Sequence, residues 1–201
     1  MPNSENYKEY QTLGSTVQVT LDGFGSFTLL ASKILLECGL GEMDTDGVGM
    51  AKLDPEKWYP LDAFLRAFDR VQAEFGDYTL KQSGLYIVKK ASQPGDFLTG
   101  IARAFETLDM GYHYNHAKSG KRMFDPQTGQ MLEGIGHYKV RTVPGKTQVF
   151  VDADTPYPCA FEEGLVTGLG QQFNAGAKVM HDPKTCRKKG APACTYSITW
   201  K

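Results

Sequence analysis

The sequence predicts an α+β fold in which N-terminal helices pack on a C-terminal antiparallel sheet. The first half carries apolar residues at helical spacing, whereas short polar and apolar segments separated by turn residues follow Tyr112. No Gly/Ser-rich or Pro-rich linker divides the 201 residues, and hydrophobic residues make up 41% of them. We therefore expect a polar tail over residues 1–14, followed by a single domain with its own core over residues 15–201.

The N-terminal half is expected to begin with a strand and to continue with helices. Val17, Val19 and Leu21 alternate with polar residues, and this pattern predicts a strand over Thr16–Leu21. Farther along the chain, apolar residues recur at the spacing of one helix face. They predict helices over residues 27–38, 60–76 and 94–108, with a further apolar segment at 80–88.

The C-terminal half is expected to be rich in β-strands. Alternating segments separated by turn residues predict strands at residues 122–124, 131–135, 137–142, 147–152 and 195–200. The apolar segment 161–173 predicts one late helix that contains Gly164, Gly168 and Gly170. Because a glycine inside a helix costs about 1 kcal/mol relative to alanine, these three suggest close approach to another backbone or to a ligand.

Charge and motif content argue against several classes of function. The net charge of −1 lacks the basic surplus that phosphate binding needs, so we expect no direct nucleic-acid partner. The polar start has no apolar signal-peptide region, and no apolar run approaches the roughly 20 residues of a membrane span. We therefore expect a cytoplasmic protein with reduced cysteines. No P-loop, GxGxxG, GxSxG or HExxH motif appears, so no motif requires an enzyme.

Three of the four cysteines are spaced like ligands of one metal ion. Cys186 and Cys194 flank a loop that carries Gly190, and Cys159 lies 27 residues before Cys186. Zinc usually takes four ligands, and His181 or Asp182 could supply the fourth. Two alternatives remain open, namely that these are small buried thiols without a metal, or that Cys186 and Cys194 form a disulfide.

Histidines and aromatic residues in the middle of the chain indicate a binding pocket. His113 and His116 would share a face on a helix and could then hold a metal or haem, but the aromatic residues around them favour an extended segment. An aromatic wall with one histidine is suited to a phenolic or similar small molecule. The expected ligand-binding residues are Tyr112, His113, Tyr114, His116, Tyr138, Phe105 and Phe150, with Tyr157 also close to the wall.

The last third of the chain carries a family pattern: a Pro-Cys pair, a Gly-x-x-x-Gly helix that ends near a phenylalanine, and two cysteines around a glycine. The residues are Tyr157-Pro158-Cys159, Gly164, Gly168, Phe173, Cys186, Gly190 and Cys194. This pattern resembles the vinyl-reductase-type small-molecule-binding domain of phenol- and xylene-responsive transcription regulators. That domain is similar in fold to haem nitric-oxide sensors and to TRAPP subunits of Golgi transport, and the resemblance extends over most of residues 15–200.

The resemblance implies both a metal site and a pocket. In the aromatic-sensing members, three cysteines and a glutamate hold a structural zinc, and the cysteines match Cys159, Cys186 and Cys194. The glutamate position falls on Pro183 here, so Asp182, or alternatively His181, is expected to take its role. The histidine and tryptophan of the family pocket fall near His113 and near Tyr138.

These expectations combine into a sensory domain that binds a small apolar or aromatic molecule and contains a structural zinc. The resemblance further implies a homodimer through the N-terminal helices and a signalling partner that receives the output, since no ATPase or DNA-binding segment follows within these 201 residues. Three rivals remain: a haem or tetrapyrrole protein, an enzyme or accessory factor that acts on a tetrapyrrole vinyl group, and a non-catalytic assembly scaffold.

Overall fold

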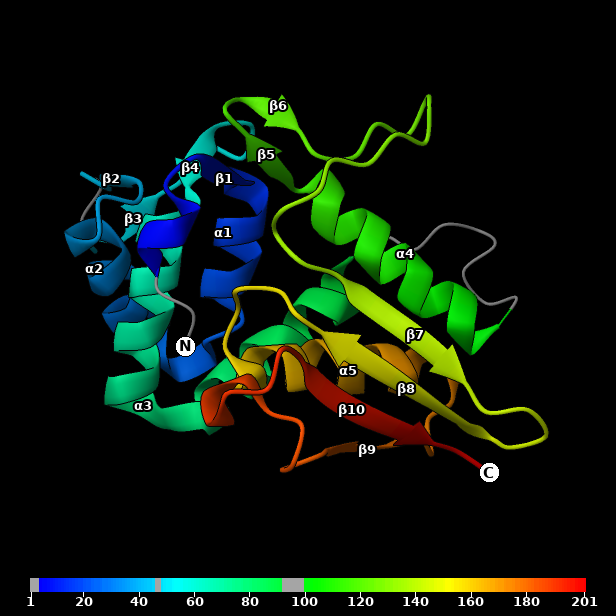
Figure 1. The fold of residues 1–201 in the computed structure, drawn as a ribbon. Coiled ribbons are helices and arrows are strands. Elements are labelled where there is room, and N and C mark those ends of the chain that lie inside the picture. The colour runs from blue at the N-terminus through cyan, green and yellow to red at the C-terminus, as the bar shows by residue number, and fades with distance from the viewer. Residues whose placement is uncertain (1–3, 46–47, 92–99) are drawn as a thin grey trace.

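The computed structural model describes residues 4–45, 48–91 and 100–201, and its helices and antiparallel sheets confirm the α+β class (Figure 1). The α-helices described are α1 (Gly14–Asp22), α2 (Thr28–Glu37), α3 (Leu61–Lys90), α4 (Ile101–Tyr114) and α5 (Cys159–Phe173). Short 3-10 turns occur at η1 (Ser4–Tyr7), η2 (Gly25–Phe27) and η4 (Arg187–Lys189).

The described strands form two four-stranded antiparallel sheets and one small hairpin. The first sheet has the order β4-β1-β5-β6, with β4 (Trp58–Pro60), β1 (Tyr10–Leu13), β5 (His116–Lys118) and β6 (Lys121–Arg122). The second has the order β7-β8-β10-β9, with β7 (Tyr138–Thr142), β8 (Gln148–Ala153), β10 (Cys194–Thr199) and β9 (Lys178–His181). The hairpin pairs β2 (Glu42–Met43) with β3 (Ala51–Lys52).

The segment predicted as a polar tail is structured from Ser4 onward, which corrects that expectation. Residues 10–13 form β1, which pairs with β4 on one side and with β5 on the other. Tyr10 is buried, and its ring lies beneath the Lys118 ammonium group. One aromatic side chain and two flanking strands therefore order a segment whose composition is mostly polar.

The strand predicted at Thr16–Leu21 is instead helix α1. Its buried residues are Gly14, Val17, Thr20 and Leu21, which follow helical spacing, and the half-buried Val19 does not continue an alternating pattern. The helical period was missed because Thr20 is polar and was not expected to be buried. Its hydroxyl donates to the Thr16 carbonyl oxygen at 2.7 Å, and this bond allows the side chain to be buried.

Helix α3 extends well beyond the predicted end at Gly76. Gly76 has φ 79° and ψ 173°, which interrupts the helical geometry there, and the apolar segment 80–88 forms the second arm of α3. Glycine adopts this positive φ without the steric cost that a Cβ imposes. The predicted start of the next helix at residues 94–96 lies outside the described residues, and α4 is described from Ile101.

Of the three glycines predicted to allow close approach, Gly164 and Gly168 lie where α5 crosses the second arm of α3, whereas Gly170 faces Ile198 of β10. A Cβ at Gly164 would lie 2.2 Å from the Lys81 carbonyl oxygen, and one at Gly84 would lie 2.2 Å from the Phe161 carbonyl oxygen. Side chains at these two positions would force the backbones apart. Helix α5 lies behind the β7-β8-β10-β9 sheet, and α4 runs alongside β7 (Figure 1).

Two further local expectations need correction, and two are confirmed. The extended segment expected from Tyr112 is instead the last turn of α4, which ends at Tyr114. The strands expected at residues 122–124 and 131–135 are shorter than predicted, and they meet only at an antiparallel bridge between Phe124 and Met131, which closes a turn over residues 125–130. The pairing of 137–142 with 147–152 and the final strand appear as β7, β8 and β10.

Among the described residues, no single helix is both long and apolar enough to cross a membrane. The segments Gly14–Asp22 and Gly25–Glu37 reach that length and composition only together, with a bend of 110° between them.

Candidate ligand cavity and metal centre

A cavity of about 540 Å³ lies between α1, α3, α4, α5 and β7. Most of its lining side chains are aliphatic or aromatic, and its few polar groups come chiefly from α1 and α4. Ligand sites of this kind combine an apolar wall with a small number of fixed polar groups. The lining residues are Thr16, Thr20, Phe64, Ile87, Val88, Ala91, Arg103, Thr107, Leu108, Met110, Gly111, Tyr112, Tyr114, Asn115, His116, Phe124, Tyr138, Tyr157, Phe161, Leu165 and Leu169.

A buried His116–Tyr157 pair forms one polar part of the cavity wall. His116 Nδ1 lies 2.6 Å from the Tyr112 carbonyl oxygen, which can only accept a hydrogen bond, so Nδ1 carries the proton. Nε2 therefore accepts from the Tyr157 hydroxyl at 2.7 Å. Burial lowers the pKa of His116 to about 4, which keeps the ring neutral near pH 7. The pair presents no charge to the cavity.

Two more tyrosines of the wall are buried. The Tyr112 hydroxyl donates to the Ile135 carbonyl oxygen at 2.6 Å, and burial raises the pKa of Tyr112 well above its usual value. Burial raises the pKa of Tyr138 in the same way, but its hydroxyl has no hydrogen-bond partner among the described residues. The Tyr138 hydroxyl is therefore a buried polar atom that a ligand or water could satisfy.

The cavity brings together four of the seven residues expected to bind ligand. Tyr112, Tyr114, His116 and Tyr138 line it, whereas Phe105, His113 and Phe150 are not part of the lining. Phe105 is fully buried in the core. Phe150 lies on the half-exposed side of β8, where the Arg141 guanidinium covers its ring. His113 is buried beside His137, and its Nδ1 donates to the Asp109 carbonyl oxygen at 2.9 Å.

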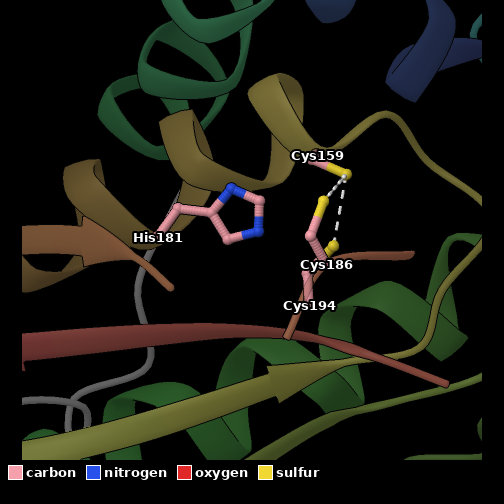
Figure 2. A group of neighbouring side chains, drawn as sticks. All are labelled: Cys159, His181, Cys186 and Cys194. Carbon is pink, nitrogen blue, oxygen red and sulfur yellow. Dashed lines mark hydrogen bonds between the residues drawn. The ribbon is translucent and has the colours of Figure 1, made fainter. Parts of the chain in front are cut away.

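The three expected cysteines converge behind the sheet, together with His181 (Figure 2). Cys159 begins α5, Cys186 precedes η4, Cys194 begins β10 and His181 ends β9. The Cys159 Sγ atom lies 3.9 Å from Cys186 Sγ and 3.2 Å from Cys194 Sγ. One donor atom from each of the four residues lies within 4.8 Å of the others. All three thiols are free, so the alternative of a Cys186–Cys194 disulfide does not describe this structure.

His181, and not Asp182, is the fourth member of this cluster, which corrects the preferred expectation. Figure 2 shows the His181 ring directed toward the sulfurs. Its Nε2 is buried without a hydrogen-bond partner among the described residues, and its ring stacks on Tyr196 at 4.8 Å. The Asp182 carboxylate instead accepts from the Lys184 backbone N–H at 2.8 Å, and that bond lowers its pKa.

The donor set and its spacing fit zinc. A tetrahedral zinc with Zn–S bonds of about 2.3 Å separates its sulfurs by about 3.8 Å. The Cys159–Cys186 separation of 3.9 Å matches this value, and the Cys159–Cys194 separation of 3.2 Å would widen on binding. Cys₃His is a usual ligand set of structural zinc sites. A bound cation would also use the unpartnered Nε2 of His181.

A buried ion pair supports the cysteine cluster. The Arg187 guanidinium lies 2.6 Å from the Glu162 carboxylate, and both side chains are almost completely buried. The Arg187 backbone N–H donates to Cys194 Sγ at 3.4 Å, and its guanidinium also donates to the Tyr157 carbonyl oxygen at 2.7 Å. A hydrogen bond from Cys159, together with the nearby Arg187 charge, lowers the pKa of the Cys194 thiol. Arg187 therefore links the cysteine cluster to Tyr157, a residue of the cavity wall.

The described histidines do not fit an axial haem ligand that faces the cavity. His116 lines the cavity, but both of its ring nitrogens are engaged. His113 has an unpartnered Nε2, but its side chain is not part of the lining. Iron ligation would require that the His116–Tyr157 bond break or that the wall rearrange.

Several residues that build the site were not identified from the sequence. Arg187 and Glu162 belong to no motif, and only the structure reveals that they form a buried pair. The lining residues of α3 and α5, such as Phe64 and Leu165, lie in apolar helical segments whose pattern does not distinguish a cavity wall from solid core. Only the three glycines of α5 indicated that this helix closely approaches another backbone or a ligand.

Comparison with solved structures identifies the fold. A mutant of the T. tengcongensis H-NOX protein aligns at a TM-score of 0.62 and 15% identity, covering 94% of this chain and 97% of that one. An S. oneidensis H-NOX protein in the Fe(II) ligation state aligns at 0.58 and 19%, covering 94% and 96%. A K. algicida H-NOX mutant aligns at 0.57 and 15%, covering 93% and 95%. No family model and no curated protein matches the sequence. At these identities the likeness establishes a shared fold.

Proposed function

We propose that this chain is a sensory domain that binds a small, neutral, apolar or aromatic molecule in the cavity between α4 and α5. A structural zinc held by Cys159, Cys186, Cys194 and His181 would brace that cavity. The vinyl-reductase-type sensor domain is the family that we propose for it, because three cysteines distant in sequence converge as that pattern requires. Its output would pass to a signalling partner.

The observation that carries this proposal is the cavity of about 540 Å³ with its mostly apolar wall. An assembly scaffold would have no need of such a volume beside a row of tyrosines. The polar groups described above, the neutral His116–Tyr157 pair and the unpartnered Tyr138 hydroxyl, suit a ligand with one hydroxyl or amine group. The cavity lining also contains Arg103, whose guanidinium is paired with Glu106 at 3.4 Å, whereas the part of the wall formed by His116, Tyr138 and Tyr157 carries no cationic side chain.

A binding assay with a neutral fluorescent probe tests the cavity. N-phenyl-1-naphthylamine is apolar and carries a single N–H group, and its emission rises when it leaves water. We expect saturable binding to the purified full chain. Leu108→Trp, which places a large side chain in the lining, should lower the affinity at least about tenfold by removing volume that a ligand needs.

The matched control is Met180→Trp, which adds the same side chain at a largely exposed position of β9. It should bind the probe like the unmodified protein. Equal binding by both variants, or no saturable binding by either the unmodified chain or the control, would remove the cavity as the ligand site.

Two alternatives are separated by the same protein sample. Haem is the alternative cofactor, because four of the aligned structures are described by Fe(II) states and a fifth by its haem redox potential. An intense visible absorption band and iron in elemental analysis would favour haem, whereas zinc without iron supports the proposed site. A reductase or accessory role on a tetrapyrrole vinyl group remains a further alternative, which conversion of such a substrate would reveal.

We also propose a homodimer through the N-terminal helices. Leu29 and Leu30 of α2 and Met43 of β2 leave apolar side chains partly or largely exposed on that part of the molecule. A mass near twice the 22.2 kDa of one chain in light scattering would support it.

A further inference from the structure

A second group of side chains that could bind a metal lies between α4 and the start of β7, apart from the cysteine cluster. Asp109 and His113 belong to the C-terminal half of α4, and His137 immediately precedes β7. One donor atom from each of these three residues lies within 4.8 Å of the others. The His113 and His137 rings face each other, with centroids 4.7 Å apart.

The His113 ring lies beside the Asp109 carboxylate, with Nδ1 3.7 Å from Asp109 Oδ1, and one of its ring nitrogens has no hydrogen-bond partner among the described residues. Its Nδ1 lies 2.9 Å from the Asp109 carbonyl oxygen, which can only accept, so Nδ1 carries the proton. Its Nε2 is therefore unprotonated in the neutral ring, and it has no partner among the described residues although the side chain is fully buried. A neutral imidazole with one nitrogen fixed by a hydrogen bond is the form that coordinates metals.

The other two side chains are also held in place by their outer atoms. His137 Nδ1 lies 3.0 Å from Asp109 Oδ2, while His137 Nε2 lies 2.8 Å from a carboxylate oxygen of Glu133. The second carboxylate oxygen, Asp109 Oδ1, accepts from the Tyr138 backbone N–H at 2.8 Å. Each prospective ligand is thus oriented by a second interaction, as in protein metal sites where a carboxylate or carbonyl supports each ligand.

We propose that Asp109, His113 and His137 bind a divalent transition-metal ion, at a site separate from the cysteine cluster. Two imidazoles and one carboxylate suit ions such as zinc, nickel or iron(II) better than calcium or magnesium, which favour oxygen ligands alone. The ion would replace the direct His137–Asp109 hydrogen bond and would use the lone pair of His113.

A simple ion pair between a protonated His137 and its two carboxylates explains only part of this arrangement. It accounts for Asp109 and Glu133, but it leaves the fully buried His113 ring with an unpartnered Nε2. A metal ion bound by Asp109, His113 and His137 would account for the placement of all three side chains. The ion would also fasten α4 to the start of β7, and these two elements supply Tyr112 and Tyr138 to the cavity wall.

The test counts zinc ions in the full-length chain. After equilibration with Zn²⁺ and gel filtration, elemental analysis and native mass spectrometry should find two zinc ions per unmodified chain. His137→Gln and Asp109→Asn should each lower this to one. Asp109→Asn keeps an oxygen that can accept from the Tyr138 N–H. This variant should therefore fold, and it tests the site even if His137→Gln proves unstable.

Two further variants assign the ions to their sites. Cys186→Ser should lose the cysteine-bound zinc and keep the other, so it also retains one ion per chain. Lys139→Gln, an exposed neighbour on β7 that pairs with Asp154, is the matched control and should retain two. Cobalt(II) offers an independent readout: the intense sulfur-to-cobalt charge-transfer band should persist in His137→Gln and disappear in Cys186→Ser.

One zinc ion per unmodified chain, with none in Cys186→Ser, would overturn this second site. So would two ions in both His137→Gln and Asp109→Asn. Neither result affects the proposed cavity, because N-phenyl-1-naphthylamine binding is measured separately.

Discussion

His116 is the residue whose ionisation most directly concerns the cavity. Its ring is buried, and its two nitrogens are engaged by the Tyr112 carbonyl and the Tyr157 hydroxyl. A proton on Nε2 would end its role as acceptor for Tyr157. The folded state therefore resists protonation of His116, which gives the protein a pH dependence that can be measured.

We predict that stability falls between pH 6.5 and pH 4 because of His116. Its pKa is about 4 in the folded protein and about 6.5 in an unfolded chain, so above pH 6.5 neither state binds the proton. Below that pH the unfolded state binds it and the folded state does not, which removes about 3 kcal/mol by pH 4. Urea unfolding at several pH values measures this loss.

His116→Gln provides the comparison, because glutamine is neutral at every pH used. The variant should be less stable at pH 7, but it should lose about 3 kcal/mol less than the unmodified protein on acidification. Effects of acid on the cysteines and carboxylates are common to both proteins and cancel in the difference. Parallel pH profiles would show that His116 is not the group responsible.

Sequence alone identified the residue types of the site better than their roles. Three cysteines and several aromatics were located because metal ligands and pocket walls restrict residue type. The roles of His113 and His116 could not be separated, because they depend on where α4 ends. Likewise, the choice between His181 and Asp182 depends on where β9 ends and on which of its faces His181 occupies, which only the pairing with β10 reveals.

At the scale of elements, the crossing of α3 and α5 determines the shape of the cavity. Both helices contribute lining residues, and glycines at the crossing let their backbones approach. The sequence predicted this feature correctly, since glycines are unfavourable in a helix unless packing requires them. It failed at α1, where a buried threonine disguised the helical period.

We predict that Gly164→Ala destabilises the protein by about 3 kcal/mol or more. The new Cβ would lie 2.2 Å from the Lys81 carbonyl oxygen, so the two backbones would have to separate, and overpacking of this kind outweighs the gain in helix propensity. Thermal or urea unfolding gives the change in the free energy of unfolding.

Gly168→Ala is the matched control on the same helix. The three atoms nearest to its Cβ would all belong to the Val88 side chain, at 3.0 to 3.4 Å, and a small shift of that side chain can relieve the contact. The change in stability should therefore stay within about 1 kcal/mol, because alanine's helix propensity offsets the contact. Similar losses in the two variants would mean that the α3–α5 crossing is not the tight contact described.

At the scale of the whole molecule, the cysteine cluster and the cavity share the start of α5. Cys159 lies between Tyr157 and Phe161, and both of these line the cavity. Arg187 contacts the cluster through its backbone N–H and contacts the Tyr157 carbonyl through its side chain. Whatever fixes the cysteines therefore also fixes part of the wall, and binding at the two sites should be coupled in both directions.

We predict that Cys186→Ser releases zinc, lowers the melting temperature and weakens binding of N-phenyl-1-naphthylamine about tenfold. Structural zinc contributes directly to folding stability, and coupling energies between linked sites are typically about 1–3 kcal/mol. Elemental analysis, thermal unfolding and probe titration report the three effects. Cys38→Ser is the matched control, because Cys38 follows α2 and lies outside the cluster. If Cys186→Ser bound as much zinc as the unmodified chain, the cysteine cluster would not be a metal centre. If it lost zinc but bound the probe normally, the cavity wall would keep its shape without the metal, and the proposed coupling through Arg187 would be wrong.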